Sequence, residues 1–250
     1  MQRTINSFLE HTSTPDASIA DNFMVPYEEN VTFVGRTRLL QSLDEMLVEV
    51  AATQRNHRVA LYGMGGIGKT QTALAYVYAH RNHYPWIFWV NADTEASLQS
   101  GFEGIAMRIG LAELVTKLQP KQLAERVLLW FRQQESWLLV FDNLDTIEFV
   151  NGFLPESGPK KHTLITTRNP NADGIPARGL DATLPEIDEA MGMLYKLSKV
   201  AIGIQTEEAG EIVIALDRLP LAIEQAAAYV REAGGNFRTF LKHYANQRAD

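Results

Sequence analysis

The sequence contains no cysteine, so it can form neither a disulfide bond nor a thiolate metal site. It also lacks any run approaching 18 apolar residues, the length that a membrane-spanning helix requires. Its first residues, Met-Gln-Arg-Thr-Ile-Asn-Ser, contain no apolar stretch long enough for a signal peptide. We therefore expect a cytoplasmic protein with no membrane partner.

An excess of basic residues is missing as well. The 23 Lys and Arg residues are outnumbered by 30 Asp and Glu residues, which gives a formal net charge of −7. Because nucleic acids are bound mainly through positive charge, we do not expect a nucleic-acid partner. The six histidines are scattered, and none forms a metal-ligand pair with a carboxylate at helical spacing.

The most informative segment that is present is Gly-Met-Gly-Gly-Ile-Gly-Lys-Thr at residues 63–70, which fits the P-loop pattern G-x-x-x-x-G-K-[ST]. Glycines let backbone N–H groups face inward around a phosphate, and the helix that follows adds its positive N-terminal end. Lys69 would reach the β- and γ-phosphates, and the Thr70 hydroxyl would bind Mg²⁺. The expected nucleotide-binding residues here are Gly63, Met64, Gly65, Gly66, Ile67, Gly68, Lys69, Thr70 and Gln71.

The neighbouring sequence supports this interpretation. Residues 58–62 form a short apolar run typical of a strand, and residues 70–84 carry apolar side chains at helical spacing. A strand, a glycine-rich loop and a helix in this order are the context that a P-loop requires. The alternative is a glycine-rich turn with an incidental lysine.

The rest of the chain alternates between strand and helix patterns up to about residue 184. Further strands are expected at 85–90, 137–141 and 163–167, and further helices at 39–50, 94–109 and from Pro120. This alternation predicts a three-layer α/β/α P-loop NTPase fold with a parallel sheet. Residues 1–24 are expected to be a tail or linker, and residues 25–184 the nucleotide-binding domain.

Residues 185–250 are expected to form a small all-α subdomain. Helices are predicted at 187–200, 206–216, 220–233 and 237–244, with no strand between them. Thr206 is the expected N-cap of the second helix, Pro220 the first residue of the third, and Gly234-Gly235 its C-terminal cap.

Three site residues follow expected strands. Gly63, Asp142 and Arg168 each come directly after one, and the carboxyl ends of parallel strands are where such sheets bind ligands. Asp142 has the Walker B position and could hold Mg²⁺ opposite Thr70, or it could simply cap a turn. Arg168 could contact a γ-phosphate, or it could pair with a carboxylate elsewhere. The candidate catalytic residues are therefore Asp142, Lys69 and Arg168.

Asn143 bears on hydrolysis. Many hydrolysing P-loop enzymes have a second acid at this position, but asparagine can only orient a water and cannot accept its proton. Asp145 could substitute only if the loop bends back. We expect slow turnover of ATP to ADP at most.

The order of the motifs resembles the NB-ARC branch of the STAND ATPases, the nucleotide switch of plant resistance proteins, animal apoptosome proteins and fungal NOD-like receptors. Phe33-Val-Gly-Arg36 matches its V-G-R element, and Leu164-Ile-Thr-Thr-Arg168 its sensor strand. Arg218-Leu-Pro-Leu-Ala222 matches G-L-P-L-A except that Arg218 replaces glycine. The resemblance implies that Phe33, Val34, Arg36, Pro220 and Leu221 contact the nucleotide and that Arg168 senses the γ-phosphate.

What the resemblance implies about function is a switch that uses ATP or ADP with Mg²⁺. ADP would hold a closed state, and exchange for ATP would release a surface for self-oligomerisation in innate immune signalling. The family's winged-helix subdomain has no counterpart here, so we expect this sequence to be part of a larger receptor whose effector and C-terminal sensor domains are its partners. The alternatives are an efficient AAA+-type ATPase, an ATP-dependent transcription regulator lacking its DNA-binding domain, and a scaffold with an inactive site.

Overall fold

The computed structural model describes residues 22–48, 57–170 and 176–248. Its centre is a six-stranded sheet in the order β1-β3-β4-β5-β2-β6, in which every neighbouring pair is parallel. The strands are β1 (Phe23–Met24), β2 (Arg58–Tyr62), β3 (Ile87–Asn91), β4 (Trp137–Asp142), β5 (Lys161–Thr167) and β6 (Arg178–Asp181).

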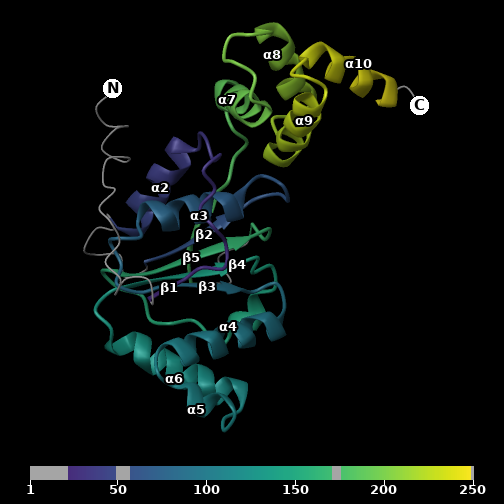
Figure 1. The fold of residues 1–250 in the computed structure, drawn as a ribbon. Helices are drawn as coiled ribbons and strands as arrows, with labels where there is room; N and C mark the ends of the chain where they lie inside the picture. The colour runs from purple at the N-terminus through teal and green to yellow at the C-terminus, as the bar shows by residue number, and fades with distance from the viewer. Residues whose placement is uncertain (1–21, 49–56, 171–175, 249–250) are drawn as a thin grey trace.

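Helices cover both faces of this sheet, as Figure 1 shows. One layer contains α2 (Thr37–Leu47) and α3 (Lys69–Ala79), and the other contains α4 (Glu95–Arg108), α5 (Ala112–Val115) and α6 (Pro120–Gln133). A short 3₁₀ helix, η2 (Ile147–Val150), follows β4. The predicted three-layer α/β/α architecture is confirmed.

Two hydrophobic cores explain why the central strands are continuous apolar runs. In β4, Leu138 and Val140 enter the core beneath α2 and α3, whereas Trp137, Leu139 and Phe141 enter the core beneath α4 and α6. Successive side chains on a strand point to opposite faces, so a strand covered on both faces needs apolar residues at every position.

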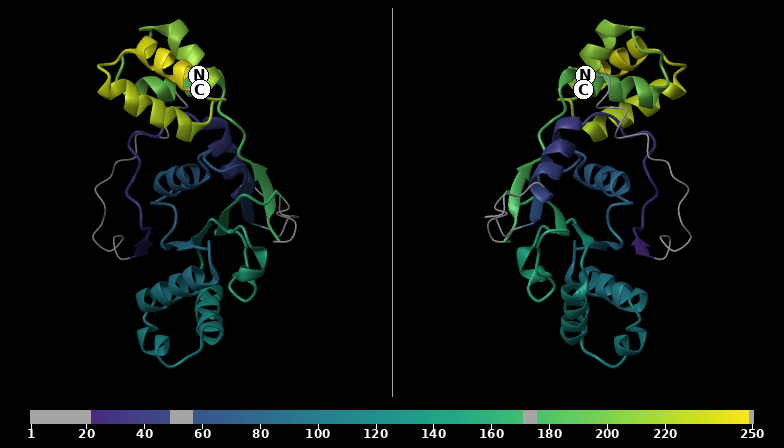
Figure 2. Two further views of the ribbon diagram at one scale, coloured as in Figure 1. Left: turned by 90° about the vertical axis from the view of Figure 1, so that its right-hand side faces the viewer. Right: turned by 90° about the vertical axis from the view of Figure 1, so that its left-hand side faces the viewer.

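The predicted helical subdomain is also present. It consists of α7 (Ile187–Ser198), α8 (Thr206–Ala215), α9 (Pro220–Glu232) and α10 (Phe237–Arg248), packed around a third core. In both views of Figure 2 this group lies on the side of α2 and α3. The cap at Gly234-Gly235 is confirmed, because Gly234 has φ 76° and Gly235 N donates to Val230 O at 2.8 Å.

Several local predictions differ from the structure. The N-cap of α8 is Gln205, at φ 54°, and Thr206 is already helical, with its hydroxyl donating to Gly203 O. The helix after the P-loop ends at Ala79, and Tyr84 turns back into the core. Residue 50, expected in the helix over 39–50, lies outside the described residues.

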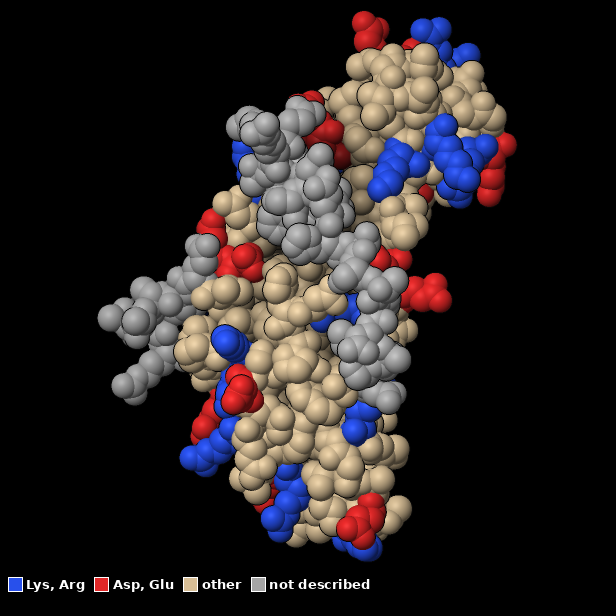
Figure 3. All heavy atoms as spheres, turned by 60° about the vertical axis from the view of Figure 1, so that its left-hand side comes forward, with Lys and Arg blue, Asp and Glu red and all other residues tan. Residues whose placement is uncertain are grey.

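Two strands, one short helix and η2 have no counterpart in the predicted pattern. β1 pairs with β3 although its residues fall inside the expected tail, and β6 pairs with β2. Each is paired on one side only within the sheet, so neither needs the long apolar run by which the central strands were recognised. No helix among the described residues is long and apolar enough to span a membrane. On the face drawn in Figure 3, acidic and basic residues are interspersed over a largely uncharged surface.

Candidate nucleotide-binding site

The sheet order brings three predicted site residues to one edge. β5 lies between β2 and β4, so Gly63, Asp142 and Arg168 stand at the carboxyl ends of three adjacent strands. The Gly63 N–H donates to Thr167 O at 3.3 Å, which ties the start of the P-loop to the end of β5.

The backbone of the P-loop needs glycine at specific places. Gly66 has φ 78°, and Gly68, the N-cap of α3, has φ 91°. These angles lie in the left-handed region that side chains with a Cβ rarely adopt. A Cβ on Gly66 would also lie 3.3 Å from Cβ of Leu221. The glycines therefore give the loop a backbone conformation without Cβ atoms, and the loop leads into the N-terminus of α3. Both features favour the binding of an anion.

Lys69 is buried against its own loop. Its Nζ donates to Gly63 O at 2.8 Å and to Met64 O at 3.0 Å. Burial lowers the pKa of Lys69, and the Asp145 carboxylate opposes that change. The ammonium group thus lies within the loop, held by two of its carbonyl oxygens.

Asp142 is buried and hydrogen-bonded to two threonines. Thr70 Oγ1 donates to Asp142 Oδ1 at 2.9 Å, and Thr166 Oγ1 donates to the same oxygen at 2.6 Å. Burial raises the pKa of Asp142, and these two hydrogen bonds oppose the increase. The hydroxyl and carboxylate oxygens that meet here are hard ligands of the kind Mg²⁺ prefers, so the donor set fits this ion.

Arg168 is paired with Asp145. Its Nε lies 3.5 Å from Asp145 Oδ2, and its backbone N–H donates to Asp145 Oδ1 at 2.7 Å. The guanidinium still lines the central cavity, and Nε lies 4.0 Å from where a Cβ on Gly65 would be. Both carboxylate oxygens of Asp145 therefore contact Arg168. Asn143 adopts φ 62°, and its backbone N–H donates to Thr166 Oγ1 at 2.9 Å.

Arg36 joins three segments by hydrogen bonds. Its guanidinium donates to the carbonyl oxygens of Ile67 in the P-loop and Thr183 before α7, and its backbone N–H donates to Glu189 Oε1 at 3.0 Å. Burial lowers the pKa of Arg36, and the Glu189 carboxylate opposes this. Lys196 of α7 also donates to Phe33 O at 3.2 Å. The V-G-R segment is therefore held between the P-loop and α7.

The start of α9 contacts the P-loop directly. Leu221 N donates to Gly66 O at 3.2 Å, and the Pro220 ring lies 3.9 Å from where a Cβ on Gly68 would be. Arg218, which replaces the glycine of G-L-P-L-A, has φ 58° and donates through Nη1 to Pro185 O at 3.3 Å. The left-handed backbone explains why glycine suits this position.

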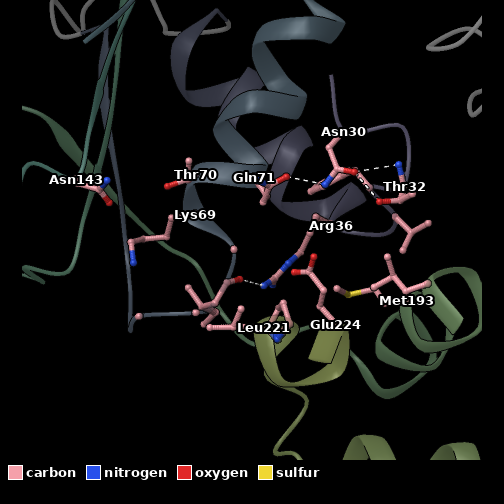
Figure 4. A pocket seen from close by; sticks show the side chains of 18 of the residues that line it. Asn30, Thr32, Arg36, Lys69, Thr70, Gln71, Asn143, Met193, Leu221 and Glu224 are labelled. Atoms are coloured by element: carbon pink, nitrogen blue, oxygen red, sulfur yellow. Dashed lines mark hydrogen bonds between the residues drawn. The ribbon is translucent and has the colours of Figure 1, made fainter. Parts of the chain in front are cut away.

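These elements enclose a cavity of about 360 Å³, a size suited to a small-molecule ligand (Figure 4). Most of the expected nucleotide-binding residues line it: Phe33, Val34, Arg36, Gly65, Gly66, Ile67, Gly68, Lys69, Thr70, Gln71, Pro220 and Leu221, together with Arg168. Gly63, Met64 and Asp142 lie outside the lining.

The cavity also has lining residues that were not among the expected contacts: Asn30, Thr32, Asn143, Met193, Leu197 and Glu224. Asn30 donates to Gln71 Oε1 at 2.7 Å and accepts from Thr32 Oγ1 at 2.7 Å. Asn143, Thr32 and Glu224 stand beside or close to recognised motifs but belong to none of them. Met193 and Leu197 come from α7, which reaches the cavity only in the fold.

The NB-ARC domain family model matches residues 36–197, more than half of the chain. The chain belongs to the NB-ARC family. A nucleotide-binding leucine-rich repeat (NLR)-like protein of Hyaloscypha variabilis is 30% identical over 250 residues, which cover 89% of this chain and 24% of that protein. The chain thus spans about a quarter of the length of this relative.

Solved structures agree on the fold of this NB-ARC module. A STAND protein with a tetratricopeptide repeat sensor from Pyrococcus horikoshii matches with a TM-score of 0.51 and 18% identity, covering 80% of this chain and 31% of that one. Cdc6p from Pyrobaculum aerophilum matches with a TM-score of 0.56 and 17% identity, covering 88% and 67%. These two likenesses show the fold alone, and the family assignment rests on the NB-ARC domain match over residues 36–197.

Proposed function

We propose that this NB-ARC module is a molecular switch that binds ADP in one state and ATP in the other, and that nucleotide exchange controls self-oligomerisation. The observation that carries the proposal is the hydrogen bond from Leu221 N of α9 to Gly66 O of the P-loop. This hydrogen bond joins the helical subdomain to the loop that would bind the phosphates. Replacement of ADP by ATP would therefore affect both the nucleotide-binding domain and the helical subdomain.

In this proposal each residue at the phosphate end has its own role. Lys69 contacts the β- and γ-phosphates, and Thr70 and Asp142 hold Mg²⁺, which would neutralise phosphate charge. Arg168 leaves Asp145 to contact a γ-phosphate. A ligand can shift an equilibrium between states only by binding them differently, and the γ-phosphate is the group that differs between ATP and ADP.

The base end is assigned to the V-G-R segment and the helical subdomain. Phe33 and Val34 lie beside the base, and Arg36 holds this segment on the P-loop through Ile67 O. Pro220 and Leu221 cover the loop from α9. The domain limits 25–184 and 185–250 remain part of the proposal, except that the first domain also includes β1 (Phe23–Met24), which pairs with β3. One segment between β6 and α7 links the two domains.

The proposal also extends beyond the residues of this chain. Since the chain covers only 24% of the H. variabilis protein, effector and sensor domains would belong to a longer chain of the same receptor type. Cytoplasmic innate immune signalling is the setting in which we place such a receptor. Hydrolysis would be slow, because Asn143 cannot accept a proton from water.

Calorimetric titration with ADP and with ATP, each with Mg²⁺, tests the proposal. We expect affinities within about tenfold of each other, since contact of Arg168 with the γ-phosphate costs its ion pair with Asp145. Lys69→Ala should abolish binding of both. Light scattering should show a larger mass with ATP than with ADP. Much tighter ADP binding, or the same mass with both nucleotides, would contradict the switch.

A further inference from the structure

One wall of the cavity is formed by the helical subdomain and carries a charge. Met193 and Leu197 of α7 are apolar, whereas Glu224 of α9 is the only carboxylate among the residues that line the cavity in the described part of the chain. Figure 4 shows the Glu224 side chain projecting from α9 into the cavity, which separates α9 from the P-loop helix. This carboxylate is not part of any nucleotide-binding motif in the sequence.

The contacts of α9 place Glu224 relative to the phosphates. Pro220 and Leu221, at the start of this helix, meet the P-loop at Gly68 and Gly66. Glu224 follows Pro220 by one helical turn, about 6 Å along the axis. In Figure 4 it lies between Lys69 at one end of the cavity and Met193 at the other.

A nucleotide with its phosphates on the loop would therefore place its sugar near this side chain. The base would lie farther on, against the apolar residues of the other end.

The chemistry of a carboxylate suits a ribose. The 2′- and 3′-hydroxyls are two adjacent hydrogen-bond donors, and a carboxylate can accept both in charge-assisted bonds. Within residues 22–48, 57–170 and 176–248, no hydrogen bond or ion pair occupies the Glu224 carboxylate. A phosphate at this position would be repelled by the negative charge, so Glu224 favours the neutral, donating part of a nucleotide.

We propose that Glu224 binds the ribose hydroxyls and makes the site selective for ribonucleotides over 2′-deoxyribonucleotides. This inference rests on the proposed nucleotide-binding function and adds the substrate class that the pocket prefers. Glu224 is a specificity residue in this account and takes no part in hydrolysis.

Calorimetry with ADP and 2′-deoxy-ADP, both with Mg²⁺, provides the test. The wild-type protein should bind ADP about tenfold or more tightly than 2′-deoxy-ADP, the ratio expected for a hydrogen bond to a charged group. In Glu224→Ala the two affinities should become equal through weaker ADP binding, and Glu224→Gln should retain part of the preference. Glu232→Ala is the matched control, because Glu232 is exposed on the same helix and lies outside the cavity lining.

Different results would overturn different claims. Equal affinities in the wild type, or an equal change for both nucleotides in Glu224→Ala, would refute the ribose contact and leave nucleotide binding intact. Absence of binding of either nucleotide by the wild type would refute the proposed function itself. Thermal unfolding without nucleotide should be the same for Glu224→Ala and the wild type, which separates loss of contact from loss of fold.

Discussion

Asn143 occupies the position after the buried Asp142, and its left-handed backbone limits which residues can replace it. Its φ is 62°, a conformation that asparagine, aspartate and glycine tolerate better than other residues. Its side-chain Nδ2 lies 3.5 Å from Asp142 Oδ2, so its amide faces the Walker B carboxylate. Aspartate could therefore adopt this backbone conformation with little strain, but it would replace the amide hydrogen bond by a carboxylate close to the Asp142 carboxylate.

We predict that Asn143→Asp increases the rate of ATP hydrolysis by about tenfold or more, because a positioned general base contributes roughly 10²–10⁴-fold. Steady-state phosphate release measures the effect. Asn143→Gly accepts the same backbone angle without a carboxylate and should stay slow. Equal rates for the two variants would show that the base is not the limiting element.

His162 makes stability depend on pH. Burial, together with nearby His57 and His80, lowers the pKa of His162 to about 4, and Tyr84 Oη lies 2.6 Å from its Nδ1. An unfolded chain binds a proton near pH 6.5, whereas the folded protein does so only near pH 4. The unfolded state therefore holds more protons between these values, so the free energy of unfolding falls as the pH decreases from 6.5.

For His162 alone this loss amounts to roughly 2 kcal/mol between pH 7 and pH 5. His162→Gln cannot titrate but keeps polar atoms near Tyr84, so its unfolding free energy should decrease less over this interval. Some dependence should remain, because burial also lowers the pKa of His80. Urea unfolding at both pH values measures the slopes. Parallel slopes for the variant and the wild type would contradict the assignment.

At the scale of elements, one glycine sets how closely α4 lies on β3. A Cβ on Gly101 would lie 2.5 Å from Val90 Cγ1, and Val90 is fully buried. By contrast, a Cβ on Gly210, within α8, would have no described atom within 4 Å, so this position is free of such a constraint. Gly101 therefore leaves no room for a larger side chain, whereas Gly210 does.

We predict that Gly101→Ala lowers the unfolding free energy by about 1–3 kcal/mol, because overpacking forces α4 away from the sheet. Gly210→Ala should instead raise it by roughly 0.5–1 kcal/mol, because alanine favours a helix more than glycine does. Urea denaturation gives both values. An increase in the unfolding free energy of Gly101→Ala would contradict this prediction, because it would mean that α4 can move away from β3 without loss of stability.

Periodicity in the sequence was enough to identify the central elements. β4 and the helix beginning at Pro120 are recognisable because apolar side chains repeat with the period of a buried strand or an amphipathic helix. The edge strand Arg178–Asp181 was not predicted because it contains few apolar residues and is only partly buried. The P-loop was predictable from its spacing, and Pro220 and Leu221 from the family resemblance. Glu224 was not, because it lies one helical turn farther along α9 and belongs to no motif.

At the scale of the whole molecule, the helical subdomain is bonded to the nucleotide-binding part at several separate places. The Arg36 backbone N–H donates to the Glu189 carboxylate, Lys196 donates to Phe33 O, and Leu221 N donates to Gly66 O. These contacts lie around the cavity. A ligand that changed the P-loop would therefore act on the same hydrogen bonds that hold the two parts together.

The nucleotide that co-purifies with the protein tests the central claim, that this cavity is an ATP/ADP site, most directly. Denaturing the purified protein and separating the supernatant by anion exchange identifies and quantifies it. We predict near-stoichiometric ADP in the wild type and none in Lys69→Ala. ATP in place of ADP would leave binding intact and assign the lack of hydrolysis to Asn143. The same amount of nucleotide in the wild type and in Lys69→Ala would contradict the claim that this loop forms the site.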